Sequence, residues 1–303
     1  MKLEIAPVPP FDFDLTAMIF SNGDEQIRRY EAGKYWQVMR VGHKLGLITV
    51  SSEGSVEKPC LSVEAKSDTR MSSADKKQIL KTVGSLFNLE VRLDRFYEDV
   101  KNDAVMFALS QKLRGLRSPS TASVFEALVD SIIEQQISLD VAQSLERRVV
   151  KAFGNALKAD GRVYYAFPTP DSLATASVER LRECGLSLRK AEYIQNASAL
   201  VEKGDLDLEA LKDRPDSDGI IAELDRVRGI GPWTAELTMI RGMRKFDVIP
   251  ADDLGVRRCL SHYYCRDSRI SAAEVRRIAE RWGRWKGLAS FYLSVARNLE
   301  MEV

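Results

Sequence analysis

The sequence predicts an α+β amino-terminal domain, in which a helix covers an antiparallel sheet, followed by an all-α domain. Segments typical of strands gather in the first hundred residues, whereas from about residue 99 onward apolar residues recur at helical spacing in one segment after another. With 303 residues, of which 45% are hydrophobic, the chain is long enough to form two hydrophobic cores. We therefore predict one domain over residues 1–99 and a second over residues 100–303.

The predicted sheet contains three strand segments. Residues 34–41 (KYWQVMRV) and 44–51 (KLGLITVS) are separated only by Gly42 and His43. Residues 59–65 (PCLSVEA) follow a loop that is rich in serine and glutamate. Such runs of β-branched, aromatic and aliphatic residues between turn residues predict a small antiparallel sheet.

Helical periodicity begins after the sheet. Ser72, with Asp75 three residues later, resembles a capping box, and the apolar residues that follow recur at helical spacing, so one helix is expected to cover the sheet. In the second domain, residues 125–133 and 141–153 show the same periodicity. Gly154 is expected to end the second of these helices.

Composition restricts the function less than it restricts the fold. The formal net charge is +1, with 45 basic and 44 acidic residues, so overall electrostatics neither require nor exclude nucleic acid. The four cysteines never approach a CxxC spacing, so no zinc or iron–sulfur site is expected. No apolar run reaches the roughly 18 residues of a membrane span, and MKLEIAPVPP lacks the pattern of a signal peptide. We predict a cytoplasmic protein with no membrane partner.

The stretch LDRVRGIGPWTAE, residues 224–236, has two interpretations. Gly229 and Gly231, with an acidic residue roughly 20 positions later, loosely resemble a dinucleotide-binding fingerprint, which requires a strand before the first glycine. The preceding apolar residues instead have the spacing of an amphipathic helix, namely Ile220, Ile221, Leu224 and Val227. We therefore predict that the glycines join two helices, with Pro232 in the first turn of the second.

Such a turn would present backbone N–H groups at the start of the second helix, where the helix dipole also favours an anion. A DNA phosphate suits this site, because these donors contact the backbone without reading the sequence. The turn alone leaves open that the glycines serve only as a helix connection.

Adjacent carboxylates follow in FDVIPADDLGVRR, residues 246–258. Asp252 and Asp253 come after a proline and directly before a predicted helix. Because aspartate is a common N-cap residue, this segment alone leaves open that both residues only cap that helix.

Together, GIGPWTA and IPADDLGVRR resemble the helix-hairpin-helix DNA glycosylase superfamily, and within it the 3-methyladenine-DNA glycosylase II, or AlkA-like, branch. Residues 11–20 (FDFDLTAMIF), 124–138 (VFEALVDSIIEQQIS) and 185–194 (GLSLRKAEYI) agree with this resemblance, which spans nearly the whole chain. It implies a helix-hairpin-helix glycosylase core after the sheet domain. It also implies a monomeric base excision repair enzyme of a prokaryotic cytosol that acts on double-stranded DNA containing a damaged base.

The register of the motif identifies the expected catalytic carboxylate. In the superfamily the essential aspartate is followed by an apolar residue at +3 and often by a basic residue at +5. Counting from Asp253 gives Val256 and Arg258, whereas counting from Asp252 places a glycine at +3. We expect Asp253 to stabilise the oxocarbenium-like charge and to activate water. Asp252 is expected to cap the helix, with the reverse assignment as the alternative.

Trp233 indicates which reaction follows base release. Members of the superfamily that also cut the DNA strand carry a lysine two residues after the second glycine and use it as a nucleophile. Trp233 occupies that position here, so we predict a monofunctional glycosylase that uses water. The tryptophan is expected to stack against a flipped base in the base pocket, with ordinary core packing as the alternative.

The resemblance also predicts residues that contact DNA. Gly229, Gly231 and Thr234 are expected to bind the DNA backbone. Gln136 occupies the position of the side chain that fills the gap left by the flipped base, and Gln135 stands beside it. The alternative for these two is a pair of solvated polar residues. No metal and no cofactor are expected, apart from a monovalent cation that the hairpin carbonyls could bind.

The substrate base is less constrained than the reaction. An alkylated base is expected, and the alternatives are an 8-oxoguanine or deaminated-purine glycosylase of the same fold. Leu237 stands where some relatives place a pocket tyrosine, so base preference does not carry over. A non-catalytic helix-hairpin-helix DNA-binding protein is a further alternative, against which Asp253 argues.

Overall fold

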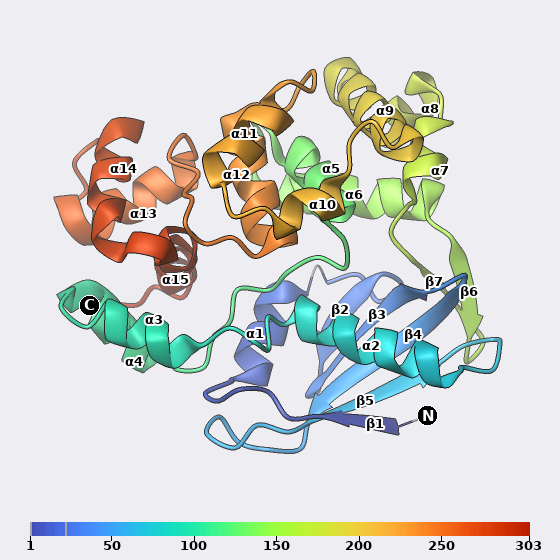
Figure 1. Ribbon diagram of the computed structural model, residues 1–303, viewed down its shortest axis with the longest axis horizontal. Coiled ribbons are helices and arrows are strands. Elements are labelled where there is room, and N and C mark those ends of the chain that lie inside the picture. Colours follow the sequence, from blue (N-terminus) through green and yellow to red (C-terminus); the bar gives the residue numbers. More distant parts are fainter. Residues whose placement is uncertain (1, 22) are drawn as a thin grey trace.

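The structure, a computed structural model, describes residues 2–21 and 23–303, and it places a sheet domain beside a larger helical part (Figure 1). The sheet is antiparallel, with the strand order β1-β5-β4-β3-β2. Its strands are β1 (Lys2–Ile5), β2 (Arg28–Glu31), β3 (Lys34–Val41), β4 (Lys44–Ser52) and β5 (Leu61–Lys66). The three predicted strands are confirmed as β3, β4 and β5, and β1 and β2 form the two edges.

Helices α1 (Phe13–Phe20) and α2 (Ser73–Leu86) cover one face of the sheet. Alternate residues of β3 and β4, such as Tyr35 and Ile48, bury their side chains beneath these helices, as the two-residue period of a strand requires. The predicted capping box is confirmed, because Asp75 N donates to Ser72 Oγ at 3.1 Å and Ser72 N donates to Asp75 Oδ2 at 2.7 Å. Phe87 fills the space between the helices and the sheet, with its ring 5.3 Å from that of Tyr35.

A β-hairpin from the helical half of the chain packs against the other face of the sheet. Strands β6 (Ala156–Ala159) and β7 (Arg162–Tyr165) place Leu157 and Tyr164 in one buried cluster with Val38 of β3. The prediction that residues 100–303 are entirely helical is therefore wrong for this segment. Asp160 and Gly161 both have positive φ angles, +49° and +74°, as a two-residue hairpin turn requires.

The remainder of the chain is helical, and its middle helices pack around α5 (Figure 1). The helices are α3 (Leu93–Asp99), α4 (Ala104–Lys112), α5 (Val124–Glu134), α6 (Leu139–Phe153), α7 (Pro170–Ala174), α8 (Val178–Glu183), α9 (Leu188–Lys203), α10 (Leu208–Asp213), α11 (Ser217–Asp225), α12 (Pro232–Thr238), the π-helical turn η1 (Met239–Met243), α13 (Leu254–Cys265), α14 (Ala272–Ala279), the 3₁₀ turn η2 (Glu280–Trp285) and α15 (Lys286–Asn298). Residues 124–133 of α5 are all buried, so neighbouring helices are positioned against this one element. Within the described residues, no helix is both long enough and apolar enough to span a bilayer.

The hydrophobic core of the helical part begins before residue 100. Helix α3 buries Leu93 and Phe96 in the same cluster as the carboxy-terminal helices, and the Phe96 ring lies 5.1 Å from that of Tyr292. The core of the sheet domain ends at Leu89. The division at residue 99 remains a prediction; α3 precedes it in the chain but packs with the helical part.

Candidate active site

The turn between α11 and α12 contains Gly229 and Gly231. Residues 217–225 form a helix, so the predicted helix pair is confirmed and the strand required by a dinucleotide fingerprint does not precede the turn. Pro232 is the first residue of α12, where its missing N–H removes no helical hydrogen bond. Helix α12 leads directly into η1, so the hairpin is anchored in the core at its far end.

The two glycines have different structural roles. Gly229 has a φ of +92°, and a Cβ at this position would lie 2.2 Å from the ring of Tyr193 on α9. Gly231 has a φ of −96° and is the N-cap residue of α12, and a Cβ there would meet no atom within 4 Å. Among the described residues, no side chain caps α12, so its first-turn N–H groups have no side-chain acceptor. The turn can therefore accept an anion at Gly231.

Gln135 and Gln136 lie directly after α5, but their surroundings differ. The side chain of Gln135 donates from Nε2 to the carbonyl oxygen of Gly229 at 2.8 Å and to Thr234 Oγ1 at 3.0 Å. It therefore fixes the hairpin against the end of α5. Gln136 is exposed and has a left-handed backbone, with a φ of +59°. The predicted DNA contacts of these residues and of Thr234, which is buried, remain predictions.

Asp253 connects the hairpin with the helix that follows it. It is the N-cap residue of α13, and its Oδ1 accepts a hydrogen bond from Val256 N at 2.9 Å. Its Oδ2 accepts a hydrogen bond from Trp233 Nε1 at 3.0 Å. Both residues are half-buried, so the carboxylate and the indole ring stand together at a partly open surface. Trp233 and Asp253 are therefore in contact although 20 positions separate them in the chain.

The prediction that Asp252 caps the helix is wrong. Asp253 N donates to the carbonyl oxygen of Pro250 at 2.9 Å, which closes a turn and places the cap one residue later than expected. The Asp252 side chain is 57% exposed, and its Oδ1 accepts from Arg257 Nη2 at 2.9 Å. Asp252 therefore lies beside the site without contacting the hairpin tryptophan.

An ion pair with a buried carboxylate connects α12 with the segment before the aspartates. Glu236 of α12 is 2% exposed, and its Oε1 accepts from Arg276 Nη1 at 2.8 Å. Burial raises the pKa of Glu236, while the Arg276 guanidinium acts in the opposite direction. Arg276 also donates to the carbonyl oxygen of Ile249 at 3.4 Å, so it connects α12 with the segment before the aspartates. This contact was not predicted, because no local signal in the sequence relates residues 40 positions apart.

A second polar cluster lies at the junction of the sheet and the helices. Arg28 of β2 donates from Nη2 to Glu146 Oε1 at 2.9 Å and lies 3.4 Å from Glu126 Oε1. Burial raises the pKa of Glu126 to about 7, although the Arg28 charge opposes this shift. Burial and the neighbouring Glu146 charge raise the pKa of Asp130 well above its usual range. One guanidinium is therefore surrounded by three buried carboxyl groups.

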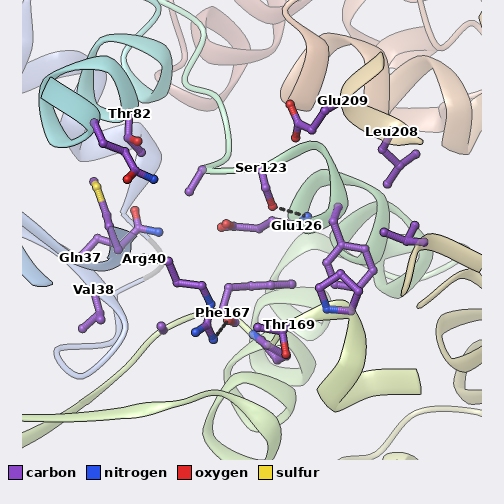
Figure 2. A pocket seen from close by; sticks show the side chains of 18 of the residues that line it. Gln37, Val38, Arg40, Thr82, Ser123, Glu126, Phe167, Thr169, Leu208 and Glu209 are labelled. Atoms are coloured by element: carbon purple, nitrogen blue, oxygen red, sulfur yellow. Dashed lines mark hydrogen bonds between the residues drawn. The ribbon is translucent and has the colours of Figure 1, made fainter. Parts of the chain in front are cut away.

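A cavity of about 610 Å³ lies beside this cluster, between β3 and the first turns of α5, α7 and α10. Figure 2 shows Glu126 and Arg40 on its walls, with Ser123 Oγ accepting from Glu126 N at 3.1 Å and Arg40 Nη2 donating to the carbonyl oxygen of Phe167 at 3.1 Å. Neither Asp253 nor Trp233 lines it. This cavity therefore belongs to the domain junction and not to the aspartate site.

Metal binding has little support from side chains. Across residues 2–21 and 23–303, no three His, Cys, Asp or Glu residues gather as metal ligands. In the hairpin turn, the carbonyl oxygens of Val227 and Gly229 already accept hydrogen bonds from Ile230 N at 3.0 Å and Gln135 Nε2. A carbonyl oxygen has a second lone pair, so a monovalent cation at the hairpin stays a prediction.

Comparison with known proteins gives this geometry a family. Residues 129–284, about half of the chain, match the family described as HhH-GPD superfamily base excision DNA repair protein. The chain belongs to the HhH-GPD superfamily. The matched range contains the hairpin, Trp233 and both aspartates, so the predicted superfamily is confirmed.

Two relatives and one solved structure match this HhH-GPD protein over most of their length. A DNA-3-methyladenine glycosylase of Bacillus subtilis is 30% identical over 85% of this chain and 84% of its own. DNA-3-methyladenine glycosylase 2 of Escherichia coli is 26% identical over 94% of both chains. The structure of a 3-methyladenine DNA-glycosylase from Archaeoglobus fulgidus has a TM-score of 0.87 and 29% identity, and it covers 99% of this chain and 100% of that one. The sheet domain is therefore shared with that structure, which confirms the predicted fold class.

Proposed function

We propose that this HhH-GPD protein is a DNA glycosylase that hydrolyses the N-glycosidic bond of an alkylated base in double-stranded DNA. The observation that carries the proposal is the hydrogen bond of 3.0 Å between Trp233 Nε1 and Asp253 Oδ2, which places a carboxylate and an aromatic ring together beside a DNA-binding type of hairpin. The names of the relatives from Bacillus subtilis and Escherichia coli support the choice of an alkylated base.

The hairpin binds the DNA backbone. The open space beside Gly231 lets a phosphate approach the first-turn N–H groups of α12, and the helix dipole favours the negative charge. Gln135 holds the turn in place through the carbonyl oxygen of Gly229. Gln136, exposed on the neighbouring loop, reaches the gap that the flipped base leaves in the duplex.

Asp253 performs the chemistry. As the C1′–N bond breaks, the base leaves with the electron pair and positive charge develops on the sugar, which the nearby carboxylate stabilises. Water then adds to C1′ and passes a proton to the carboxylate, so the products are a free base and an abasic site. An alkylated base that already carries positive charge leaves as a neutral molecule and needs no proton from the protein.

Trp233 excludes a strand-cutting reaction that starts from a lysine at this position. Its indole has no amine that could attack C1′ and form a covalent intermediate with the sugar. The protein therefore releases the base and leaves the strand intact. The half-buried ring offers a face on which the extruded base can stack.

Excision from a panel of duplexes tests this function. Each duplex carries one 3-methyladenine, 7-methylguanine, hypoxanthine or 8-oxoguanine, and abasic sites are scored before and after alkali. We expect base release that needs alkali for strand cutting. We also expect Asp253→Asn to lower the rate at least about a hundredfold, while asparagine still caps α13 and preserves the fold.

Asp252→Asn is the matched control, because it neutralises the adjacent carboxylate without touching the Trp233 contact. If Asp253→Asn excised the base at the wild-type rate, the assigned role of Asp253 would be refuted. Strand cutting without alkali would refute the monofunctional reaction. DNA binding with no release from any duplex would instead identify a non-catalytic DNA-binding protein.

A further inference from the structure

The Asp253 carboxylate is held from two sides by elements that are separate in the chain. Val256 N in the first turn of α13 donates to Oδ1 at 2.9 Å, and Trp233 Nε1 in the first turn of α12 donates to Oδ2 at 3.0 Å. Rotation of the carboxylate about its Cβ–Cγ bond would weaken both contacts, because each donor is aimed at a different oxygen. The plane of the carboxylate is therefore fixed before any substrate binds.

We propose that Trp233 is a positioning residue whose indole N–H orients the Asp253 carboxylate toward the sugar, a role separate from stacking of its ring on the base. This inference rests on the proposed glycosylase function. The relevant atom is Nε1, so the ring face can still contact a flipped base while its edge holds the carboxylate.

Two other tryptophan–aspartate pairs in the protein show what is unusual about this one. Trp285 Nε1 donates to Asp99 Oδ2 at 2.8 Å, and Arg284 lies 3.3 Å from the same oxygen. Trp282 Nε1 donates to Asp103 Oδ2 at 3.1 Å, and Arg281 lies 3.6 Å from it. In both pairs a guanidinium compensates the carboxylate charge.

Asp253 has no such contact, and the Arg241 guanidinium, which forms its ion pair with Glu134, interacts with Asp253 only over a longer distance. Among residues 2–21 and 23–303, no Lys, Arg or His nitrogen lies within ion-pair distance of its carboxylate, and the neighbouring Arg257 and Arg276 approach Asp252 instead. Its two hydrogen-bond donors are both neutral. Neutral donors orient a carboxylate without cancelling its charge, and that charge is what a developing oxocarbenium ion requires.

The tryptophan also connects binding with chemistry. It lies two residues after Gly231, in the first turn of the helix whose N-terminus faces the predicted phosphate. Gln135 fixes this turn through both Gly229 and Thr234. A phosphate docked at Gly231 and a carboxylate held by Trp233 are therefore placed by one rigid element, so docking of the backbone sets the distance from the carboxylate to the sugar.

Trp233→Phe tests the inference, because phenylalanine keeps an aromatic face and removes the N–H. Single-turnover excision is measured on a duplex with one 7-methylguanine, or with the base that the panel identifies. We expect the rate to fall about tenfold or more, as for loss of one hydrogen bond to a charged group. The dissociation constant for a duplex with a tetrahydrofuran abasic analogue should change less than about threefold.

The pH dependence provides a readout that simple packing would not move. Loss of a donor to the charged carboxylate disfavours the charged form, so the acid-side midpoint of the pH–rate profile should shift to higher pH in Trp233→Phe. Trp282→Phe and Trp285→Phe are the matched controls. They remove the same kind of hydrogen bond elsewhere, and they should leave both the excision rate and the midpoint unchanged.

A second measurement observes the contact itself and keeps all tryptophans in place. With ¹⁵N-labelled tryptophan, the protein shows indole N–H signals from its four tryptophans. The Trp233 signal should move in Asp253→Asn while the Trp282 and Trp285 signals stay in place. A Trp233 signal unaffected by Asp253→Asn would overturn the proposed contact.

The outcomes separate this inference from the function on which it rests. The positioning role alone would be overturned if Trp233→Phe kept the excision rate and pH profile of the wild type while Asp253→Asn was inactive. Full activity of Asp253→Asn would overturn the proposed catalytic carboxylate itself. A slow Trp233→Phe that also loses affinity for the abasic analogue would assign the tryptophan to DNA binding and would overturn positioning.

Discussion

The junction of the sheet with the helices and the hairpin site both use carboxylates to join distant parts of the chain, but they surround them differently. At the junction, Glu126 and Glu146 face the buried guanidinium of Arg28. At the hairpin site, the half-buried Asp253 receives two neutral N–H donors. Charges that face one another hold two parts together, whereas a carboxylate with neutral donors keeps its charge for a ligand.

The largest loss of stability is expected when the buried ion pair at the junction is removed. Arg28→Met removes the guanidinium that faces the buried carboxyl groups of Glu126 and Glu146. We expect the free energy of unfolding to fall by about 3–5 kcal/mol, as measured by denaturant titration. Protein that remains folded should still excise the base, because Arg28 does not contact the hairpin. A loss smaller than about 1 kcal/mol would show that the junction does not depend on this ion pair.

The next largest effect is expected at the hairpin, where substitutions at Gly229 and Gly231 should change stability differently. Gly229→Ala forces a Cβ within 2.2 Å of the Tyr193 ring and keeps a φ of +92°, so we expect a loss of about 2–3 kcal/mol in the free energy of unfolding. Gly231→Ala is the matched control, because its Cβ enters open space. It should change stability by less than about 0.5 kcal/mol but weaken DNA binding. Equal losses of stability in both variants would contradict the different roles assigned to the two positions.

A smaller effect depends on pH. The pKa of Asp130 is raised in the folded protein, so the stability that its protonated form contributes is complete below the unfolded value and is lost as the pH rises through the folded value. Asparagine does not titrate. Asp130→Asn should therefore gain stability relative to wild type as the pH rises from 5 to 8, by about 1 kcal/mol or more. Thermal unfolding at both pH values checks this, and a difference that shrinks with rising pH would contradict it.

Asp252→Asn should have the smallest effect. Its side chain is 57% exposed, and exposed ion pairs contribute about 0–1 kcal/mol. We expect unfolding within about 0.5 kcal/mol of wild type and an excision rate within about twofold. A loss of activity as large as that of Asp253→Asn would mean that the two aspartates act as a unit.

The sequence predicted the elements whose signals are local. Runs of strand-forming residues in 34–51 predicted two paired strands, and the Ser72 and Asp75 pattern predicted a helix start. Apolar spacing before Gly229 predicted the first helix of the hairpin. The hairpin after α6 was missed although Asp160 and Gly161 are a typical two-residue turn, because helical periodicity on both sides dominated the interpretation.

The site was predictable in its residues but not in their partners. The motif placed Trp233 and Asp253 in one site, and the structure brings them into contact. The helix cap was assigned one residue too early, because two adjacent aspartates offer the same side chain to the helix start. The contacts of Glu236 with Arg276 and of Arg28 with α5 join residues far apart in the chain, and they depend on tertiary packing that no local pattern records.

The small hairpin β6–β7 affects whether the two domains can be produced as separate fragments. It extends from the helical half, yet Leu157 and Tyr164 complete the second core of the sheet domain with Val38 and Leu47. A chain cut at residue 99 would leave apolar surface exposed on both fragments, which favours aggregation over independent folding. We therefore expect the two halves to unfold together, and an insertion or deletion in either half to be constrained by the surface of the other.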